Sequence, residues 1–195
     1  MGALRLSDLQ RPGLEPVSLT VAPAQTLCIH GHSGSGKTLL LRAIADLDPN
    51  RGQVFLGEVE RTTIPAHRWR QQVMYLPPES HWWADRVGPH AAHWPLPLLQ
   101  ALGFDQDVLD WELARLSSGE RQRLSLARVL AREPLALLLD EPTANLDPAN
   151  TLTLEGLIAD YQQQRSAPVI WVSHDAAQRS RVATREYIID SGRLQ

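Results

Sequence analysis

The stretch Gly31-His32-Ser33-Gly34-Ser35-Gly36-Lys37-Thr38 decides the fold of this chain. It follows an apolar run at residues 27–29, which predicts a buried strand, and it opens a segment of helical spacing at residues 38–47. Glycines let the backbone N–H groups of such a turn surround phosphate oxygens, and the start of the helix adds a partial positive charge. The spacing therefore predicts a phosphate-binding loop in which Lys37 reaches the terminal phosphates and Thr38 ligates magnesium.

A pair of carboxylates follows a second buried strand. Residues 135–139 are all apolar, and Asp140 and Glu141 come directly after them. Because ligands of open α/β sheets bind at the carboxyl ends of parallel strands, this pair is expected beside the phosphate-binding loop. Asp140 would hold magnesium through water, and Glu141 would polarise an attacking water as a general base. Together the two motifs predict a nucleotide-hydrolysing site.

The rest of the chain alternates strands with helices, which implies a mainly parallel sheet covered on both faces. The segment at residues 78–118 is rich in tryptophan and proline, and we interpret it as an inserted, mostly helical subdomain. The core of this single domain, residues 1–195, would then comprise residues 1–77 and 119–195. The remaining strands are expected at residues 17–21, 73–76, 169–172 and 187–190, and the helices at residues 120–132 and 148–164.

Composition limits the partners and the compartment. The net charge of -3 and the pI near 6.1 argue against nucleic acid as a partner, because no overall positive field attracts it. Cys28 is the only cysteine and lies in the apolar run before the loop, which predicts a buried thiol and a cytosolic, reducing compartment. The longest uninterrupted apolar stretch, residues 135–139, is too short to span a bilayer, and no targeting segment is expected.

The run Leu116-Ser117-Ser118-Gly119-Glu120 narrows the class of nucleotide site. It resembles the signature sequence of ATP-binding cassette (ABC) ATPases, and it precedes Asp140 as it does in that family. Its serines also suit the start of a helix. With Ser117, the exposed N–H groups around Ser118, Gly119 and Glu120 would form a second anion site that does not reach its own phosphate-binding loop. In the family, such a site completes the ATP site of the facing subunit.

Two more segments resemble the same family, in the expected order. Ala144-Asn145-Leu146-Asp147 resembles the loop that crosses the dimer interface, and Val172-Ser173-His174-Asp175 resembles the strand end with the switch histidine, which would place His174 at the γ-phosphate. The resemblance covers residues 14–193 and implies ATP and Mg²⁺ as ligands. The implied fold is an α/β P-loop NTPase core with a mainly parallel sheet, a small N-terminal antiparallel β portion and a short inserted α-helical subdomain at about residues 78–118.

Two positions depart from the family pattern. Residues 1–54 contain no Phe, Trp or Tyr, so the aromatic that usually stacks on adenine is missing, and Arg11 or Leu14 would have to substitute for it. Pro77-Pro78-Glu79 stands where a glutamine that meets magnesium is expected. A proline side chain carries no ligand atom, so Glu79 is the candidate for contact with the metal.

The segment between the two halves of the core is rich in histidine and tryptophan. His90 and His93, one helical turn apart, suggest a metal site together with His81, and surface histidines beside prolines are the alternative. The helix that follows carries four arginines, which are expected to form a solvated face with one or two contacts to phosphate or to an interface: Arg121, Arg123, Arg128 and Arg132. Four tryptophans of this segment are expected to form the core of a small subdomain or part of a docking surface for a membrane partner: Trp82, Trp83, Trp94 and Trp111.

The resemblance implies the ATPase subunit of a transporter. Two copies would close head to tail around two ATP molecules, and separate integral-membrane permease subunits would hold this cytoplasmic homodimer at the inner face of the cell membrane. Residues 70–73 and 169–175 are also similar to those of bacterial iron-export ABC ATPases. Two alternatives stay open, namely a soluble ABC ATPase that acts on ribosomes or DNA, and a nucleotide-binding regulator with little turnover.

Overall fold

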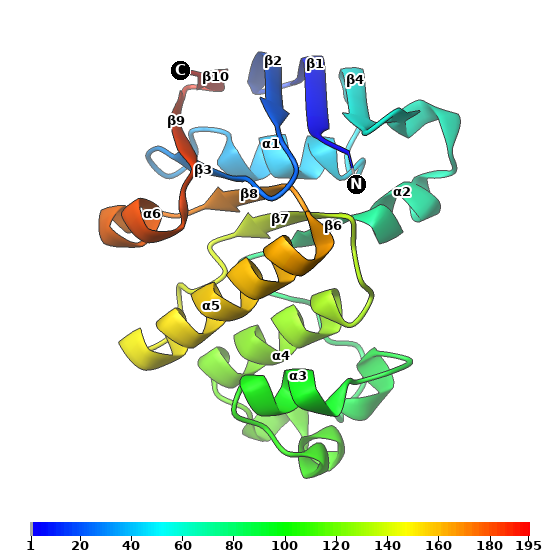
Figure 1. Cartoon of the computed structure of the whole chain (residues 1–195), viewed down its shortest axis with the longest axis vertical. Coiled ribbons are helices and arrows are strands. Elements are labelled where there is room, and N and C mark those ends of the chain that lie inside the picture. The colour runs from blue at the N-terminus through cyan, green and yellow to red at the C-terminus, as the bar shows by residue number, and fades with distance from the viewer. Residues whose placement is uncertain (1) are drawn as a thin grey trace.

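The computed structural model describes residues 2–195, which form two β-sheets with a helix between them (Figure 1). The strands are β1 Leu4–Arg11, β2 Leu14–Val21, β3 Thr26–His30, β4 Arg51–Leu56, β5 Val59–Glu60, β6 Val73–Leu76, β7 Ala136–Asp140, β8 Val169–Val172, β9 Arg185–Asp190 and β10 Arg193–Leu194. The smaller sheet is antiparallel, with the order β2-β1-β4-β5. The larger sheet has the order β10-β9-β3-β8-β7-β6.

Helices cover both faces of the larger sheet. The α-helices are α1 Lys37–Ile44, α2 Ala66–Gln72, α3 Leu96–Ala101, α4 Ser118–Leu130, α5 Pro148–Arg165 and α6 Ala176–Val182, and the short 3-10 helices are η1 Arg61–Thr63, η2 Gly88–His90, η3 Gln106–Asp110 and η4 Leu113–Arg115. Figure 1 shows α1 between the two sheets, with α4 and α5 on the opposite face of the larger one. None of the helices in residues 2–195 is long and apolar enough to cross a membrane.

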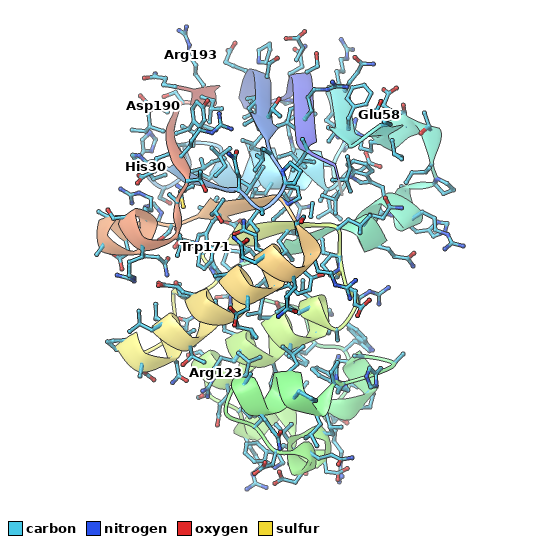
Figure 2. The ribbon with its side chains drawn as sticks, viewed as in Figure 1. His30, Glu58, Arg123, Trp171, Asp190 and Arg193 are labelled. Carbon is cyan, nitrogen blue, oxygen red and sulfur yellow. The ribbon has the colours of Figure 1, made fainter. Side chains whose placement is uncertain are left out.

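The larger sheet is mainly parallel, as predicted. The strands from β9 to β6 all pair in parallel, β10 is antiparallel to β9, and β3 lies inside the sheet as expected. Successive side chains of a strand point to opposite faces, so each inner strand contributes to two cores. Leu138 and Ile170 pack on the α1 side, whereas Leu139 and Trp171 pack on the α5 side, where Figure 2 places Trp171 between the sheet and α5.

The predicted N-terminal antiparallel portion is confirmed, and it is larger than the expected strand at residues 17–21. β1 was not predicted as a strand. Its buried residues Leu4 and Leu6 alternate as in a strand, but the pattern then breaks at Asp8, which has a φ of 48°, and the pairing with β2 shifts register before Leu9. Such a bulge interrupts the period-2 pattern on which a strand prediction rests.

The helix after the phosphate-binding loop is shorter than predicted, and the signature helix begins earlier. α1 ends at Ile44 rather than at Leu47, and Asp46 takes a left-handed conformation with a φ of 57°. α4 begins at Ser118 because Ser117 caps it, and it ends at Leu130. Both differences lie at helix ends, where the sequence pattern is least informative.

The segment at residues 78–118 holds one short α-helix, α3, and the 3-10 helices η2, η3 and η4. Its buried side chains Val87, Trp94 and Phe104 share one hydrophobic cluster with β7 and α4. The segment therefore packs on the core through its own apolar residues, and loops join its short helical turns.

One histidine of this segment lies in a different place from that expected. His90 is buried, with 4% of its surface exposed, and its Nε2 lies 3.2 Å from the carbonyl oxygen of Ala84. Its ring meets the rings of Trp82 and Trp83 edge-on at 4.7 and 4.4 Å. The expectation of a surface histidine is therefore wrong for His90, because packing against two tryptophans covers it.

Candidate functional site

The phosphate-binding loop connects β3 to α1 in a conformation that requires glycine. Gly31 and Gly36 have φ values of 147° and 113°, and a Cβ on Gly31 would lie 2.1 Å from the carbonyl oxygen of Ile189. The Nζ of Lys37 donates to the carbonyl oxygens of Gly31 and His32 at 2.8 Å each. The loop thus curls around a buried amine, as the binding of a phosphate chain requires.

Two opposing effects act on the pKa of Lys37. Its burial lowers the pKa of the amine, and the negative charges of Glu141 and Asp140 raise it. The two loop carbonyls that accept hydrogen bonds from Lys37 carry only partial negative charges, so they are weak partners for its amine. A phosphate group bound in the loop would offer this amine a full negative charge in place of two carbonyl dipoles.

Asp140 joins the two predicted motifs directly. It ends β7, is 2% exposed, and its Oδ2 accepts a hydrogen bond from the Oγ1 of Thr38 at 2.7 Å. The hydroxyl of Tyr75, on the neighbouring strand β6, donates to the same oxygen at 2.9 Å. Sequence reasoning predicted Thr38 beside Asp140 but missed Tyr75, although a phenol in a short apolar strand is a signal that it seeks a polar partner.

Glu141 and His174 form the other half of the site. Glu141 takes a left-handed backbone conformation with a φ of 49°, an unusual conformation for glutamate that clusters at functional positions. Its Oε1 lies 3.3 Å from the Nε2 of His174, and no hydrogen bond reaches this buried oxygen within residues 2–195. Burial raises the pKa of Glu141, and the charge of His174 opposes that shift. A carboxylate with a free oxygen and a raised pKa suits a general base.

The residues present fit a nucleotide with magnesium. The oxygens of Thr38 and Asp140 are hard ligands of the kind that Mg²⁺ prefers. No group of three His, Cys, Asp or Glu that could hold a metal gathers anywhere in residues 2–195. Mg²⁺ would therefore take its other ligands from phosphate oxygens and water, as it usually does in nucleotide sites.

Glu79, the other candidate for the metal, is not linked to Thr38 or Asp140 in the part of the chain that the structure describes. It is exposed in the segment after β6, and within residues 2–195 it forms no hydrogen bond or ion pair with Thr38 or Asp140. His81, His90 and His93 likewise form no metal cluster in the part of the chain that the structure describes. The metal role of Glu79 stays a prediction.

The signature run forms a capped helix start. Ser117 caps α4, and its Oγ accepts a hydrogen bond from the N–H of Glu120 at 3.2 Å. The carboxylate of Glu120 accepts one from the N–H of Ser117 at 2.8 Å, which closes a reciprocal capping box. Ser117 and Ser118 are exposed. Since α1 and α4 lie on opposite faces of the larger sheet, this surface faces away from the chain's own phosphate-binding loop.

The signature lies against the segment predicted to cross a dimer interface. A Cβ on Gly119 would lie 2.9 Å from the carbonyl oxygen of Asn145, so glycine permits this close approach. The segment ends at Asp147, whose carboxylate caps α5 by accepting the N–H of Asn150 at 2.9 Å. Arg123 of α4 also donates to the side chain of Asn150. These contacts hold the two segments beside each other.

A buried network near Glu141 was not predicted. Gln178, 1% exposed, donates to Thr143 at 2.9 Å and to Glu155 at 2.8 Å. Arg181 forms a two-pronged ion pair with Glu155. The network ties the segment after Glu141 to α5 and α6. No sequence motif marks it, because its members come from three separate elements.

The substitutes considered for the adenine-stacking aromatic differ in their surroundings. Leu14 is 5% exposed and belongs to the core, which leaves little of its surface for a base. The guanidinium of Arg11 pairs with Asp48, and its side chain is 17% exposed. The carbonyl oxygen of the neighbouring Gly13 would lie 3.5 Å from a Cβ on Gly36, so Arg11 is close in the chain to a residue beside the phosphate-binding loop. Arg11 is therefore the better placed of the two for contact with a nucleotide base.

Comparisons with known proteins identify the family. The family model described as "ABC transporter" matches residues 14–144. An aliphatic sulfonates import ATP-binding protein of Frankia alni is 34% identical over all of this chain and 80% of its own length. A methionine import ATP-binding protein of Pseudomonas syringae pv. syringae is 31% identical over 96% of this chain. The chain spans 62% of the length of that methionine relative.

A solved structure supports the fold independently. A chain described as the ATP-binding subunit of an ABC transporter superposes with a TM-score of 0.87, covering 98% of this chain and 87% of its own, at 21% sequence identity. The predicted α/β P-loop NTPase fold is thereby confirmed. The matched range includes the phosphate-binding loop and the Asp140-Glu141 pair, which meet in the structure, and the signature run, which lies apart from them. This chain belongs to the ABC transporter family.

Proposed function

We propose that this chain binds ATP with Mg²⁺ and hydrolyses ATP, as the subunit that powers a separate membrane permease. The observation that carries the proposal is the meeting of Thr38, Asp140 and Glu141 at the ends of α1 and β7. Mg²⁺ bound there would neutralise charge on the terminal phosphates. Lys37 would leave its two loop carbonyls for the phosphates, and Thr38 would turn its hydroxyl from Asp140 to the metal.

Glu141 would then act on the attacking water. Its free Oε1 is an acceptor for a water proton, and a buried general base with a raised pKa binds that proton more strongly than an exposed carboxylate. His174, 3.3 Å away, would orient the water and contact the γ-phosphate. The buried network of Gln178 and Glu155 would keep the segment after Glu141 in place.

The proposal includes a homodimer that forms on ATP binding. Ser117 and Ser118 are exposed at a helix start, where an anion is favoured, and a bound phosphate would replace the Glu120 carboxylate as the acceptor for the Ser117 donors. Because this surface faces away from the chain's own loop, a second chain would supply the phosphates that it contacts. Two such chains would form two composite sites related by a twofold axis.

The permease would dock in a groove between the core and the segment at residues 78–118, which we propose as the helical subdomain. This groove has a volume of about 410 Å³, and Trp83, 63% exposed, lines it. Its lining includes three arginines and two histidines but no carboxylate: Arg70, Arg128, Arg132, His67 and His90. A permease segment that carries carboxylates and an apolar side chain would complement it. The dimer would thus be held at the cytoplasmic face of the membrane.

Phosphate release by the purified chain tests the ATPase proposal. The wild type should release phosphate from ATP when Mg²⁺ is present, Lys37→Ala should not, and Arg68→Ala, which changes an exposed cation of α2, should match the wild type. Lys37 is also the only lysine of the sequence, so an amine reagent followed by mass spectrometry reports on one side chain. ATP should protect it. A chain that is protected by ATP but releases no phosphate would favour the nucleotide-binding regulator instead.

The relatives reported above are named for the import of two chemically different substrates, methionine and aliphatic sulfonates. The ATP site itself does not determine which molecule is transported, so the similarity to iron-export ATPases stays a prediction.

Co-purification from membranes tests the proposed docking of a permease. A multispanning protein should be retained by the tagged wild type and lost on Arg128→Glu, which reverses charge in the groove. Retention by both proteins would contradict the groove as the docking site.

A further inference from the structure

The hydroxyl of Tyr75 lies between the metal site and the groove. It donates to the Oδ2 of Asp140 at 2.9 Å, and Thr38 donates to that same oxygen at 2.7 Å. Tyr75 is also part of the lining of the groove that contains Trp83 and Arg128. One side chain thus connects the candidate magnesium ligand with the surface proposed for the permease.

The two donors to Asp140 differ in what metal binding would do to them. Thr38 is itself a candidate metal ligand, so its hydroxyl would turn away from Asp140 when Mg²⁺ binds. Tyr75 has no such role and would remain the donor that fixes the carboxylate. A partner that orients a metal-binding carboxylate usually contributes to metal affinity although it does not touch the ion.

The position of Tyr75 depends on elements that line the groove. It lies on β6, the edge strand of the larger sheet, opposite Leu138 of β7. Both α2 and α4 pack against β6. On α4, the Arg128 guanidinium stacks over Trp82 at 4.6 Å and Trp83 at 5.4 Å. Movement of these groups would move β6, and Tyr75 with it.

We propose that Tyr75 is a positioning residue for the magnesium site, and that it transmits changes in the groove to Asp140. This inference rests on the proposed ATPase function. It assigns to Tyr75 the link that the segment Pro77-Pro78-Glu79 does not provide, since Glu79 is exposed and does not contact Asp140 through a hydrogen bond or ion pair in residues 2–195.

The chain offers a matched control for removal of this hydroxyl. Tyr161 is also partly buried, and its hydroxyl donates to the carbonyl oxygen of Pro134 at 2.7 Å. Pro134 precedes β7 and Asp140 ends it, so the two tyrosine hydroxyls lie at opposite ends of one strand. Tyr75→Phe and Tyr161→Phe each remove one oxygen and one hydrogen bond, and only the first affects Asp140.

Mn²⁺ affinity in the presence of a non-hydrolysable ATP analogue, followed by electron paramagnetic resonance, measures the positioning role. Tyr75→Phe should weaken Mn²⁺ binding by about tenfold, whereas Tyr161→Phe should leave it unchanged. Affinity for the metal-free analogue should be the same in all three proteins. Equal Mn²⁺ affinity for Tyr75→Phe and wild type would overturn the inference. If the wild type itself binds neither analogue nor Mn²⁺, the proposed function fails instead.

Nuclear magnetic resonance of the otherwise unchanged chain tests the link to the groove. The sequence has three tyrosines, so ring-labelled tyrosine gives three signals, and Tyr75→Phe and Tyr161→Phe identify two of them. The Tyr75 signal should shift on addition of Mg²⁺ with the analogue. It should also shift on Trp83→Ala, which removes a groove side chain that stacks on Arg128 and packs against His90. The link would be contradicted if the Tyr75 signal did not shift on Trp83→Ala, or if the Tyr161 signal shifted as much as the Tyr75 signal.

Discussion

The Nε2 of His174 lies 3.3 Å from the Oε1 of Glu141, so the proposed switch histidine and the proposed general base are already neighbours in a single chain. Glu141→Gln keeps the shape of this pair and removes its base. We expect ATP binding to persist, turnover to fall by at least about 100-fold, and an ATP-bound dimer to accumulate. Phosphate release and size-exclusion chromatography with ATP measure these effects. Glu58→Gln, at an exposed site, should behave as wild type. Normal turnover by Glu141→Gln would show that another group is the base.

The capping box at the signature predicts a stability effect that does not depend on nucleotide. Ser117→Ala removes the acceptor for the Glu120 N–H, so the free energy of unfolding should fall by about 1 kcal/mol. Urea denaturation of the nucleotide-free chain measures it. Ser118→Ala, one residue later and outside the box, should cost much less. Equal losses for the two variants would indicate that the cap contributes nothing.

Asp48 should make stability depend on acid pH. The Arg42 guanidinium, and then that of Arg11, hold the pKa of Asp48 at about 2 against the opposing effect of burial. Because this pKa is below its ordinary value, the stabilisation is complete above the ordinary pKa and is lost as the pH falls toward about 2. We expect Asp48→Asn to cost about 1–2 kcal/mol at neutral pH and progressively less below pH about 4. Asp160→Asn, on the exposed face of α5, is the control in the same urea titrations. A cost that is independent of pH would contradict the ion-pair origin.

Cys28 should be unreactive in the folded chain. It is fully buried in β3, and burial, with a smaller effect of Glu186, raises the pKa of its thiol to about 12. Thiolate is the reactive form, so a disulfide reagent at pH about 8 should modify the thiol only after denaturant is added. Rapid modification of the native protein would mean that this strand opens readily.

The sequence was informative where local spacing determines the backbone or where parallel topology brings strand ends together. The loop around Lys37 and the approach of Asp140 to Thr38 are of this kind, because both follow from a strand, a turn and a helix start. The contact between Tyr75 and Asp140 depends on how far a side chain reaches from the neighbouring strand, which no spacing encodes. The buried network of Gln178 and Glu155 depends on the packing of separate helices in the same way.

Long-range packing also explains where the predictions were wrong. His90 was expected at the surface because prolines surround it in the sequence, yet Trp82 and Trp83 cover its ring. Arg128 was expected in a solvated face and instead stacks on the same two tryptophans, and its burial lowers its pKa. In both cases the partners come from other elements of the chain, so the local pattern of polar residues gave no indication of burial.

Mixing two inactive variants tests most directly the central claim, which is that the signature of one chain completes the phosphate-binding loop of another. Lys37→Ala disables a loop, and Ser117→Arg blocks a signature. Neither variant alone should hydrolyse ATP, because every site in each dimer lacks one part. A mixed dimer pairs one intact loop with one intact signature, so an equal mixture should recover about a quarter of the wild-type phosphate release. A mixture as inactive as its components, with both variants folded, would contradict the composite site.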